Sequence, residues 1–194
     1  MSIIITKSKG IVDPNQPHLG GNSVEINPHT FCPSAWSYVI KKYNIKSMLD
    51  VGSGRGHAPN WFKDQGVNAF AIEGLDNNVV NAIYPTELVD LTKSSYKADV
   101  DLVHCVEVVE HIDEKFLDNL LTTMCNGKYL FMTHGVPGQK GHHHVNNQPT
   151  QYWIDHLDDR GFYESVEDSI MIKELAKQDK ATHIIETGML FIRK

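Results

Sequence analysis

Cysteine, positive charge and long apolar runs are all scarce in this chain of 194 residues. Its 3 cysteines form no CxxC pair, and their odd number argues against a disulfide framework or a cysteine zinc site. We expect free thiols that pack as small apolar groups. Lysine and arginine total 18 against 24 acidic residues, and the net charge of -6 gives no general attraction to phosphate backbones. We therefore do not expect nucleic acid as a partner.

No apolar run approaches the length that spans a bilayer, so we expect no membrane association. The first ten residues, MSIIITKSKG, hold three consecutive isoleucines, which is too few for the apolar core of a signal peptide. These absences predict a cytoplasmic protein. A hydrophobic content of 41% and the chain length fit one globular domain that covers residues 1–194.

Strand and helix patterns alternate along most of the chain. Strand patterns occupy 47–51, 68–72, 87–91, 99–106 and 128–133, and helical patterns occupy 34–43, 59–66, 113–125 and 149–161. This alternation predicts a mainly parallel sheet with helices on both faces. Two β-like segments follow at 162–168 and 183–194 with no long helical pattern between them, which predicts antiparallel pairing at one edge. Residues 1–33, rich in Pro, Gly and Asn, predict an irregular arm and a possible lid that hinges at Gly20 and Gly21.

A glycine-rich turn, LDVGSGRGH (49–57), follows the first of these strands and precedes a helix. Gly52, Gly54 and Gly56 permit positive φ and remove the Cβ atoms that would keep a ligand away from the backbone. Free amides at the helix start favour an anionic group. The spacing is DxGxGxG, which differs from the GxGxxG of the usual dinucleotide fingerprint.

Acidic residues stand at the ends of three successive strands. Asp50 ends the first, Glu73 the second and Asp90 the third. A carboxylate in the position of Glu73 can accept hydrogen bonds from ribose hydroxyls, and the backbone amide of Leu91 could lie near an adenine edge. The three acids should line the crevice where open α/β sheets bind ligands.

These segments together resemble the class I S-adenosylmethionine-dependent methyltransferases over residues 35–165. The resemblance implies a Rossmann-like, doubly wound, mainly parallel seven-stranded sheet with an antiparallel edge strand. Asp50 would orient the amino group of the cofactor, Glu73 its ribose and Asp90 its adenine. The remaining cofactor-binding residues implied are Gly52, Ser53, Gly54, Gly56, Gly74, Leu91 and Val106. An NAD-binding oxidoreductase and a non-catalytic S-adenosylmethionine-binding partner protein are the alternatives.

A possible metal motif, EVVEH, follows the fourth of these strands. In a helical turn Glu107, Glu110 and His111 would share one face, where they could bind a divalent ion such as Mg²⁺. ExxEH resembles the metal-binding motif of small-RNA 2′-O-methyltransferases and of ubiquinone-biosynthesis O-methyltransferases. In the small-RNA enzymes a further histidine after the fifth strand completes the metal site, and the corresponding region here holds His134, His142, His143 and His144, of which we take His143. Related sequences also occur in methyltransferases without a known metal, where Glu-His belongs to the loop below the cofactor. The motif that follows the fifth strand in the small-RNA enzymes is absent, so metal-dependent 2′-O-methylation of RNA is only an alternative.

The stretch GHHHVNNQPTQYW (141–153) lies on the predicted acceptor side of the pocket. In an extended run the first and third histidines point one way and the second the other. The candidate acceptor-binding residues are His142, His143, His144 and Asn146, and the candidate bases are His111 and His134. Tyr152 and Trp153 should instead pack on the sheet with Leu157. The sequence thus predicts methyl transfer to a small polar acceptor, with oxygen favoured and the oligomeric state left open.

Overall fold

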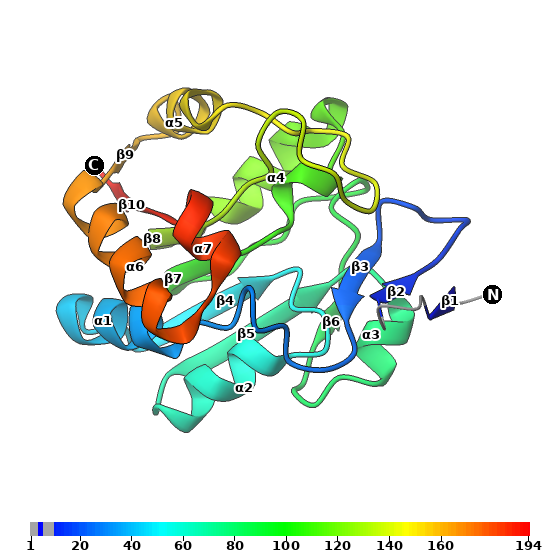
Figure 1. Cartoon of the computed structure of the whole chain (residues 1–194), viewed down its shortest axis with the longest axis horizontal. Coiled ribbons are helices and arrows are strands. Elements are labelled where there is room, and N and C mark those ends of the chain that lie inside the picture. Colours follow the sequence, from blue (N-terminus) through cyan, green and yellow to red (C-terminus); the bar gives the residue numbers. More distant parts are fainter. Residues whose placement is uncertain (1–3, 6–9) are drawn as a thin grey trace.

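The computed structural model describes residues 4–5 and 10–194, so residues 1–3 and 6–9 of the expected arm lie outside the described residues. Figure 1 shows a twisted central sheet between two layers of helices. The described residues give this sheet the strand order β6-β5-β4-β7-β8-β10-β9. In that order the strands are Glu87–Leu88, Asn68–Glu73, Ser47–Val51, Val100–Cys105, Gly127–Met132, Met189–Arg193 and Phe162–Glu164.

The first five strands of this order are parallel, and β10 pairs antiparallel with both β8 and β9. The predicted mainly parallel seven-stranded sheet with antiparallel pairing near one edge is confirmed. The chain runs from β4 outward to β5 and β6, then returns to β7 on the other side of β4. This reversal places a crevice beyond the carboxyl ends of β4 and β7.

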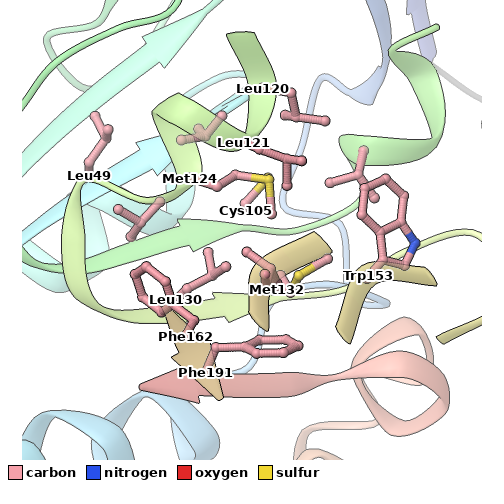
Figure 2. Packing of buried hydrophobic residues seen from close by; sticks show 14 of the residues in the cluster. Leu49, Cys105, Leu120, Leu121, Met124, Leu130, Met132, Trp153, Phe162 and Phe191 are labelled. Carbon is pink, nitrogen blue, oxygen red and sulfur yellow. The ribbon is translucent and has the colours of Figure 1, made fainter. Parts of the chain in front are cut away.

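Alternation along the strands sends apolar side chains into two separate cores. One core packs Leu49, Cys105 and Met132 against α4 (Leu117–Met124) and α5 (Thr150–Asp158), as Figure 2 shows. As predicted, Trp153 and Leu157 are fully buried there, and Tyr152 packs against them. The other core lies under α1 (Pro33–Tyr43), α2 (His57–Asp64), α6 (Val166–Asp179) and α7 (Thr182–Thr187).

The prediction for residues 162–194 is wrong in part. The expected strands at 162–168 and 183–194 shrink to β9 and β10, and two helices, α6 and α7, separate them. The sequence pattern did not predict α6 because Val166, Ile170 and Met171 are apolar but exposed. Apolar residues therefore occur on both faces of this helix, and no single apolar stripe marks it. A short helix, α3 (Asp76–Val80), was also missed.

The N-terminal arm is only partly irregular: residues 13–19 and 24–32 form turns and irregular structure as expected, but three short strands correct the expectation elsewhere. The strands β1 (Ile4–Ile5), β2 (Gly10–Val12) and β3 (Gly20–Ser23) form a small antiparallel sheet. Ile11 and Leu19 pack against Leu75, which anchors the arm beside β5. Among the described residues, no helix combines the length and apolarity needed to cross a membrane.

One buried carboxylate ties α1 to α6. Asp168 accepts hydrogen bonds from the hydroxyls of Tyr38, Tyr43 and Ser165 and from the ammonium of Lys42, whose Nζ is 2.5 Å from Oδ1. Burial alone would raise the pKa of Asp168, but Lys42 and the three hydroxyls outweigh burial and lower it to about 2. The network therefore favours the folded state whenever Asp168 is ionised.

We expect Asp168→Asn to lower the free energy of unfolding at pH 7 by about 2 kcal/mol, because an Asp of pKa about 3.9 in the unfolded chain drops to about 2 on folding. Since the folded pKa is depressed, this contribution is complete above the unfolded pKa and disappears as the pH falls toward 2. Denaturant titrations from pH 7 to pH 3 should show the gap between wild type and variant closing below pH 4. Asp159→Asn, the same change at an exposed residue, should show no gap; a gap independent of pH would contradict this account.

Candidate cofactor and acceptor site

A pocket of about 380 Å³ lies beyond the carboxyl ends of β4, β5 and β7. The glycine turn after β4 forms its floor, and residues 18–23 of the arm cover it. The loop of residues 139–142 together with His144 closes one end, where His183 of α7 also contributes. The pocket thus draws on segments from both ends of the chain.

The glycine turn adopts the conformation that its sequence predicts. Gly52, Gly54 and Gly56 have φ of 69°, 56° and 78°, a region that side chains disfavour. The amides of Gly52 and Ser53 both donate to the carbonyl of Ile72 at 3.0 Å, which joins the turn to β5. A Cβ at Gly52 would lie 2.5 Å from Cγ2 of Val108, so the turn and the loop after β7 pack with no room for a side chain.

Glu73, the predicted ribose-binding acid, lies at the end of β5 and lines the pocket. Its two carboxylate oxygens accept from the amides of Gly54 and Leu75, each at 2.8 Å. Burial raises the pKa of Glu73, and these amides oppose that shift. The side chain of Asn78 and the backbone of Gly74 also oppose this shift, and acceptance from ribose hydroxyls stays a prediction.

Asp50 also lines the pocket, and the structure pairs it with a residue that the sequence did not single out. Its Oδ1 lies 2.6 Å from Nδ1 of His104 on β7, and both side chains are almost fully buried. Nε2 of His104 is buried and has no hydrogen-bond partner. Parallel pairing of Asp50 with His104 brings them together, and that register is invisible in the local sequence.

Asp90 does not line the pocket, although its neighbour Leu91 does. Its carboxylate accepts from the amide and hydroxyl of Thr92 at 2.9 and 2.7 Å and pairs with Lys93 at 3.0 Å. Burial alone would raise the pKa of Asp90, but these hydrogen bonds lower it to about 2. The carboxylate of Asp90 makes its shortest hydrogen bonds within its own turn and does not line the pocket. Its contact with the adenine therefore stays a prediction that these bonds do not support.

The arm packs against the cofactor side of the pocket. Asn22 accepts a hydrogen bond of 2.8 Å from Asn78, and His18 lies 3.4 Å from the carboxylate of Asp90. Leu19 packs so closely on Gly74 that a Cβ there would lie 2.4 Å from its Cδ2. The predicted cofactor residue Gly74 therefore lies directly under the arm. These contacts place the arm as a cover, while its role as a lid stays a prediction.

Glu110, His111 and His144 come together beside the pocket: the two histidines line it, and Glu110 lies buried behind them. Each offers one ligand atom, and these atoms all lie within 4.8 Å of one another. Glu110 and His111 belong to a 3₁₀ turn, Val109–His111. The carbonyl of Glu110 accepts from the amides of Val145 and Asn146, which fixes the loop that carries the third ligand.

The electrostatics of this cluster suit a cation. Glu110 is fully buried and neither carboxylate oxygen has a hydrogen-bond partner. Burial and the nearby carboxylate of Glu107 raise the pKa of Glu110 well above its ordinary value. Burial, followed by neighbouring histidines, lowers the pKa of His111 to about 4, and burial also lowers that of His144. The imidazoles are therefore neutral at pH 7, with lone pairs available.

Glu107 and His143, two members of the predicted metal set, lie outside this cluster. Glu107 has a left-handed φ of 55°, and its carboxylate accepts from Thr133 at 2.8 Å and lies 3.3 Å from Nδ1 of His183. His143 occupies a turn with φ of 50° and does not line the pocket, whereas His142 and His144 do. The expected extended run is a turn here, and His144 rather than His143 joins the cluster.

His134 and Asn146, two other candidates, lie away from the pocket wall. Both ring nitrogens of His134 have partners, the carbonyl of Gly135 at 3.2 Å and the hydroxyl of Thr150 at 3.1 Å. Burial lowers the pKa of His134. Asn146 is buried and accepts from Gln148 at 3.1 Å. Neither placement supports contact with an acceptor.

The sequence profile of the family described as methyltransferase domain matches residues 31–171. The chain belongs to this methyltransferase family. The match covers both the glycine turn and the EVVEH segment, as the resemblance to class I enzymes implied. The alternative of an NAD-binding oxidoreductase is therefore set aside.

Other methyltransferases resemble this one over parts of their length. A ubiquinone biosynthesis O-methyltransferase of Rickettsia bellii is 34% identical over an alignment that covers 48% of this chain and 46% of the relative. This methyltransferase thus spans about half the length of the curated relatives it matches. A TehB-like S-adenosylmethionine-dependent methyltransferase of Corynebacterium glutamicum has a TM-score of 0.60 with 13% identity, covering 84% of this chain and 89% of the other. Magnesium protoporphyrin IX methyltransferase of Synechocystis with bound S-adenosylhomocysteine has a TM-score of 0.57 with 14% identity, covering 81% and 80%. Both structures show the shared fold.

The pocket of this methyltransferase has the features that its cofactor needs. The hydroxyl of Ser53, Nε1 of Trp36 and Nε2 of His104 are buried in its wall without hydrogen-bond partners. The glycine turn offers a surface without side chains, and Glu73 lines the pocket. The residues present therefore fit a nucleoside that carries a zwitterionic amino acid.

We expect Gly52→Ala to weaken binding of S-adenosylhomocysteine at least about tenfold, because the new Cβ would collide with Val108 and displace the turn. Gly66→Ala is the matched control, since Gly66 also has a positive φ of 82° but has open space where a Cβ would lie. Both variants should lose about 1 kcal/mol of stability through backbone strain. Calorimetric titration should show weakened binding in the first alone; equal affinity in the two would contradict the role of the turn.

Proposed function

We propose that this methyltransferase transfers a methyl group from S-adenosylmethionine to an oxygen atom of a small polar acceptor, at a site that also holds a divalent metal ion. The observation that carries the proposal is the cluster of Glu110, His111 and His144, whose ligand atoms lie within 4.8 Å of one another and whose two histidines line the pocket. The O-methyltransferase of Rickettsia bellii supports the choice of oxygen.

The donor set favours a first-row transition metal over Mg²⁺. Two of the three ligands are imidazole nitrogens, which suit Mn²⁺, Fe²⁺, Co²⁺ or Zn²⁺, whereas Mg²⁺ prefers oxygen ligands. A cation here would offset the cost of burying the carboxylate of Glu110 without hydrogen bonds. When bound, the ion would orient the acceptor oxygen and lower the pKa of its hydroxyl.

The residues on the cofactor side of the pocket align the reacting atoms. Methyl transfer from a sulfonium is an in-line displacement, so the main task is to hold sulfur, methyl carbon and acceptor oxygen in one line. In our proposal the glycine turn holds the methionine moiety and Glu73 the ribose, with Leu91 and Val106 along the pocket wall. The arm excludes water from this alignment.

His183 is a better candidate for the base than either histidine predicted from sequence. Its Nδ1 faces the carboxylate of Glu107 at 3.3 Å, and the residue lines the pocket. A carboxylate that accepts from Nδ1 leaves Nε2 free to take a proton from an acceptor hydroxyl. The low pKa of His111, about 4, makes it a weak base, and His134 lies outside the pocket wall.

The metal proposal predicts selective losses of Mn²⁺ binding. Glu110→Gln and His144→Ala should each weaken binding at least about tenfold, because each removes one of the converging ligands. His143→Ala is the matched control, since it removes the adjacent histidine that lies outside the cluster. The measurement is the loss of the free-ion electron paramagnetic resonance signal on titration with protein. Equal binding by all four proteins would exclude this site.

The reaction itself can be tested with S-adenosylmethionine that carries a trideuterated methyl group. We expect the purified chain to label hydroxyl compounds in a small-molecule cell extract, detected by mass spectrometry, and to leave total RNA unlabelled. His183→Gln should lower the labelling rate at least about tenfold with unchanged affinity for S-adenosylhomocysteine, because it removes the base and leaves the cofactor site intact.

Three outcomes would count against the proposal. Label found only in RNA would favour nucleic acid as the acceptor, and label on nitrogen or carbon would overturn the choice of oxygen. Binding of S-adenosylhomocysteine without label in either fraction would favour a non-catalytic partner protein.

A further inference from the structure

A polar pair interrupts an apolar row of the central sheet. Strand register places Ala71, Asp50, His104, Phe131 and Leu190 side by side across β5, β4, β7, β8 and β10. The side chains of Asp50 and His104 are only 5% and 4% exposed. A buried ionic pair gives no stability advantage over apolar residues of similar volume. Its presence in this row therefore suggests a role in binding.

One nitrogen of His104 is available to a ligand. Nδ1 lies 2.6 Å from the carboxylate of Asp50, which fixes the orientation of the ring. Around the ring pack Trp36, Phe62 and Phe131, with centroid distances of 5.3, 6.0 and 5.4 Å. Nε2 is buried without a partner, and His104 lines the pocket. A ligand in the pocket can satisfy this atom, since the described surroundings offer it no polar partner.

The neighbouring ring of Trp36 also carries a buried nitrogen without a hydrogen-bond partner. Trp36, on α1, stacks edge-on against His104 at 84°, and its Nε1 is likewise buried without a partner. An indole N–H can only donate, so the complementary ligand group must accept hydrogen bonds. Both rings line the same pocket. When the ring of His104 is protonated, Nδ1 donates to Asp50 and Nε2 is a donor as well, so the two adjacent rings together present two donors that fit the two oxygens of a carboxylate.

We propose that His104, as an imidazolium whose Nδ1–H is held by Asp50, donates from Nε2 to the carboxylate of the methionine moiety of the cofactor, and that Nε1 of Trp36 donates to the same carboxylate. Asp50 acts through His104 by holding the ring so that Nε2 faces the ligand. The amino-acid end of the cofactor is thus recognised by ring nitrogens from α1 and β7 in addition to the glycine turn. This subsite is independent of the metal cluster and of the acceptor.

The test compares S-adenosylhomocysteine with S-adenosyl-3-thiopropylamine, which lacks only the carboxylate, by calorimetric titration of the whole chain. Wild-type protein should prefer the first ligand at least about tenfold, as expected for charge-assisted hydrogen bonds. His104→Asn keeps a donor near Asp50 but offers nothing in place of Nε2, so it should abolish most of this preference. Trp36→Phe keeps a large ring and should lower the preference by about threefold.

The ratio of the two affinities separates recognition from structural damage. A variant that only perturbs the fold weakens both ligands equally, whereas the proposed role requires the loss to fall on S-adenosylhomocysteine. His57→Asn, at another histidine that lines the pocket, should leave the ratio unchanged. Equal loss of both ligands in His104→Asn, or a wild-type protein that does not distinguish them, would overturn the proposal. If His104→Asn does not fold, the ratio in Trp36→Phe decides.

Discussion

The parallel pairing of β4 with β7 is the constraint on which both halves of the pocket depend. Because the strand order reverses between these two strands, the segments that follow them diverge and leave a crevice. The turn after β4 supplies Gly52, and the loop after β7 supplies Val108, which packs on it without space for a Cβ. The same pairing aligns Asp50 with His104. A shift in this register would therefore disturb the cofactor floor and the acceptor wall together.

Histidine has different chemistry in different parts of this pocket because its surroundings differ. His104 is oriented by a buried carboxylate among aromatic rings, which suits hydrogen bonding to a ligand. Burial keeps His111 and His144 neutral at pH 7, as a metal ligand must be. His183 faces a carboxylate at the end of the pocket, as a base requires. Because the residue type is the same, the neighbouring carboxylate distinguishes these proposed roles. Asp50 lies beside His104, Glu110 beside His111 and His144, and Glu107 beside His183.

Local sequence patterns predicted the parts of the site that local backbone determines. The glycine turn, Glu73 and the adjacent Glu110 and His111 all follow from spacing within one strand or turn. His104 and His183 could not be found in this way. The first depends on the register between two strands, and the second lies on α7, which was predicted as a strand. His144 rather than His143 joins the cluster because His143 lies in a turn with a positive φ, and no sequence pattern predicted that turn.

The arm shows how a short segment can couple the two halves of the pocket. Asn22 contacts Asn78 on the cofactor side, and a Cβ at Gly21 would lie 3.5 Å from both His111 and His142 on the acceptor side. Among the described residues, Ile11 and Leu19 pack against Leu75, and the hydrogen bond between Asn22 and Asn78 is worth about 1 kcal/mol. These contacts join the cofactor side to the acceptor side through one short segment. The lid predicted from the sequence requires such a position, because a segment that closes over the cofactor must also meet the wall that faces the acceptor.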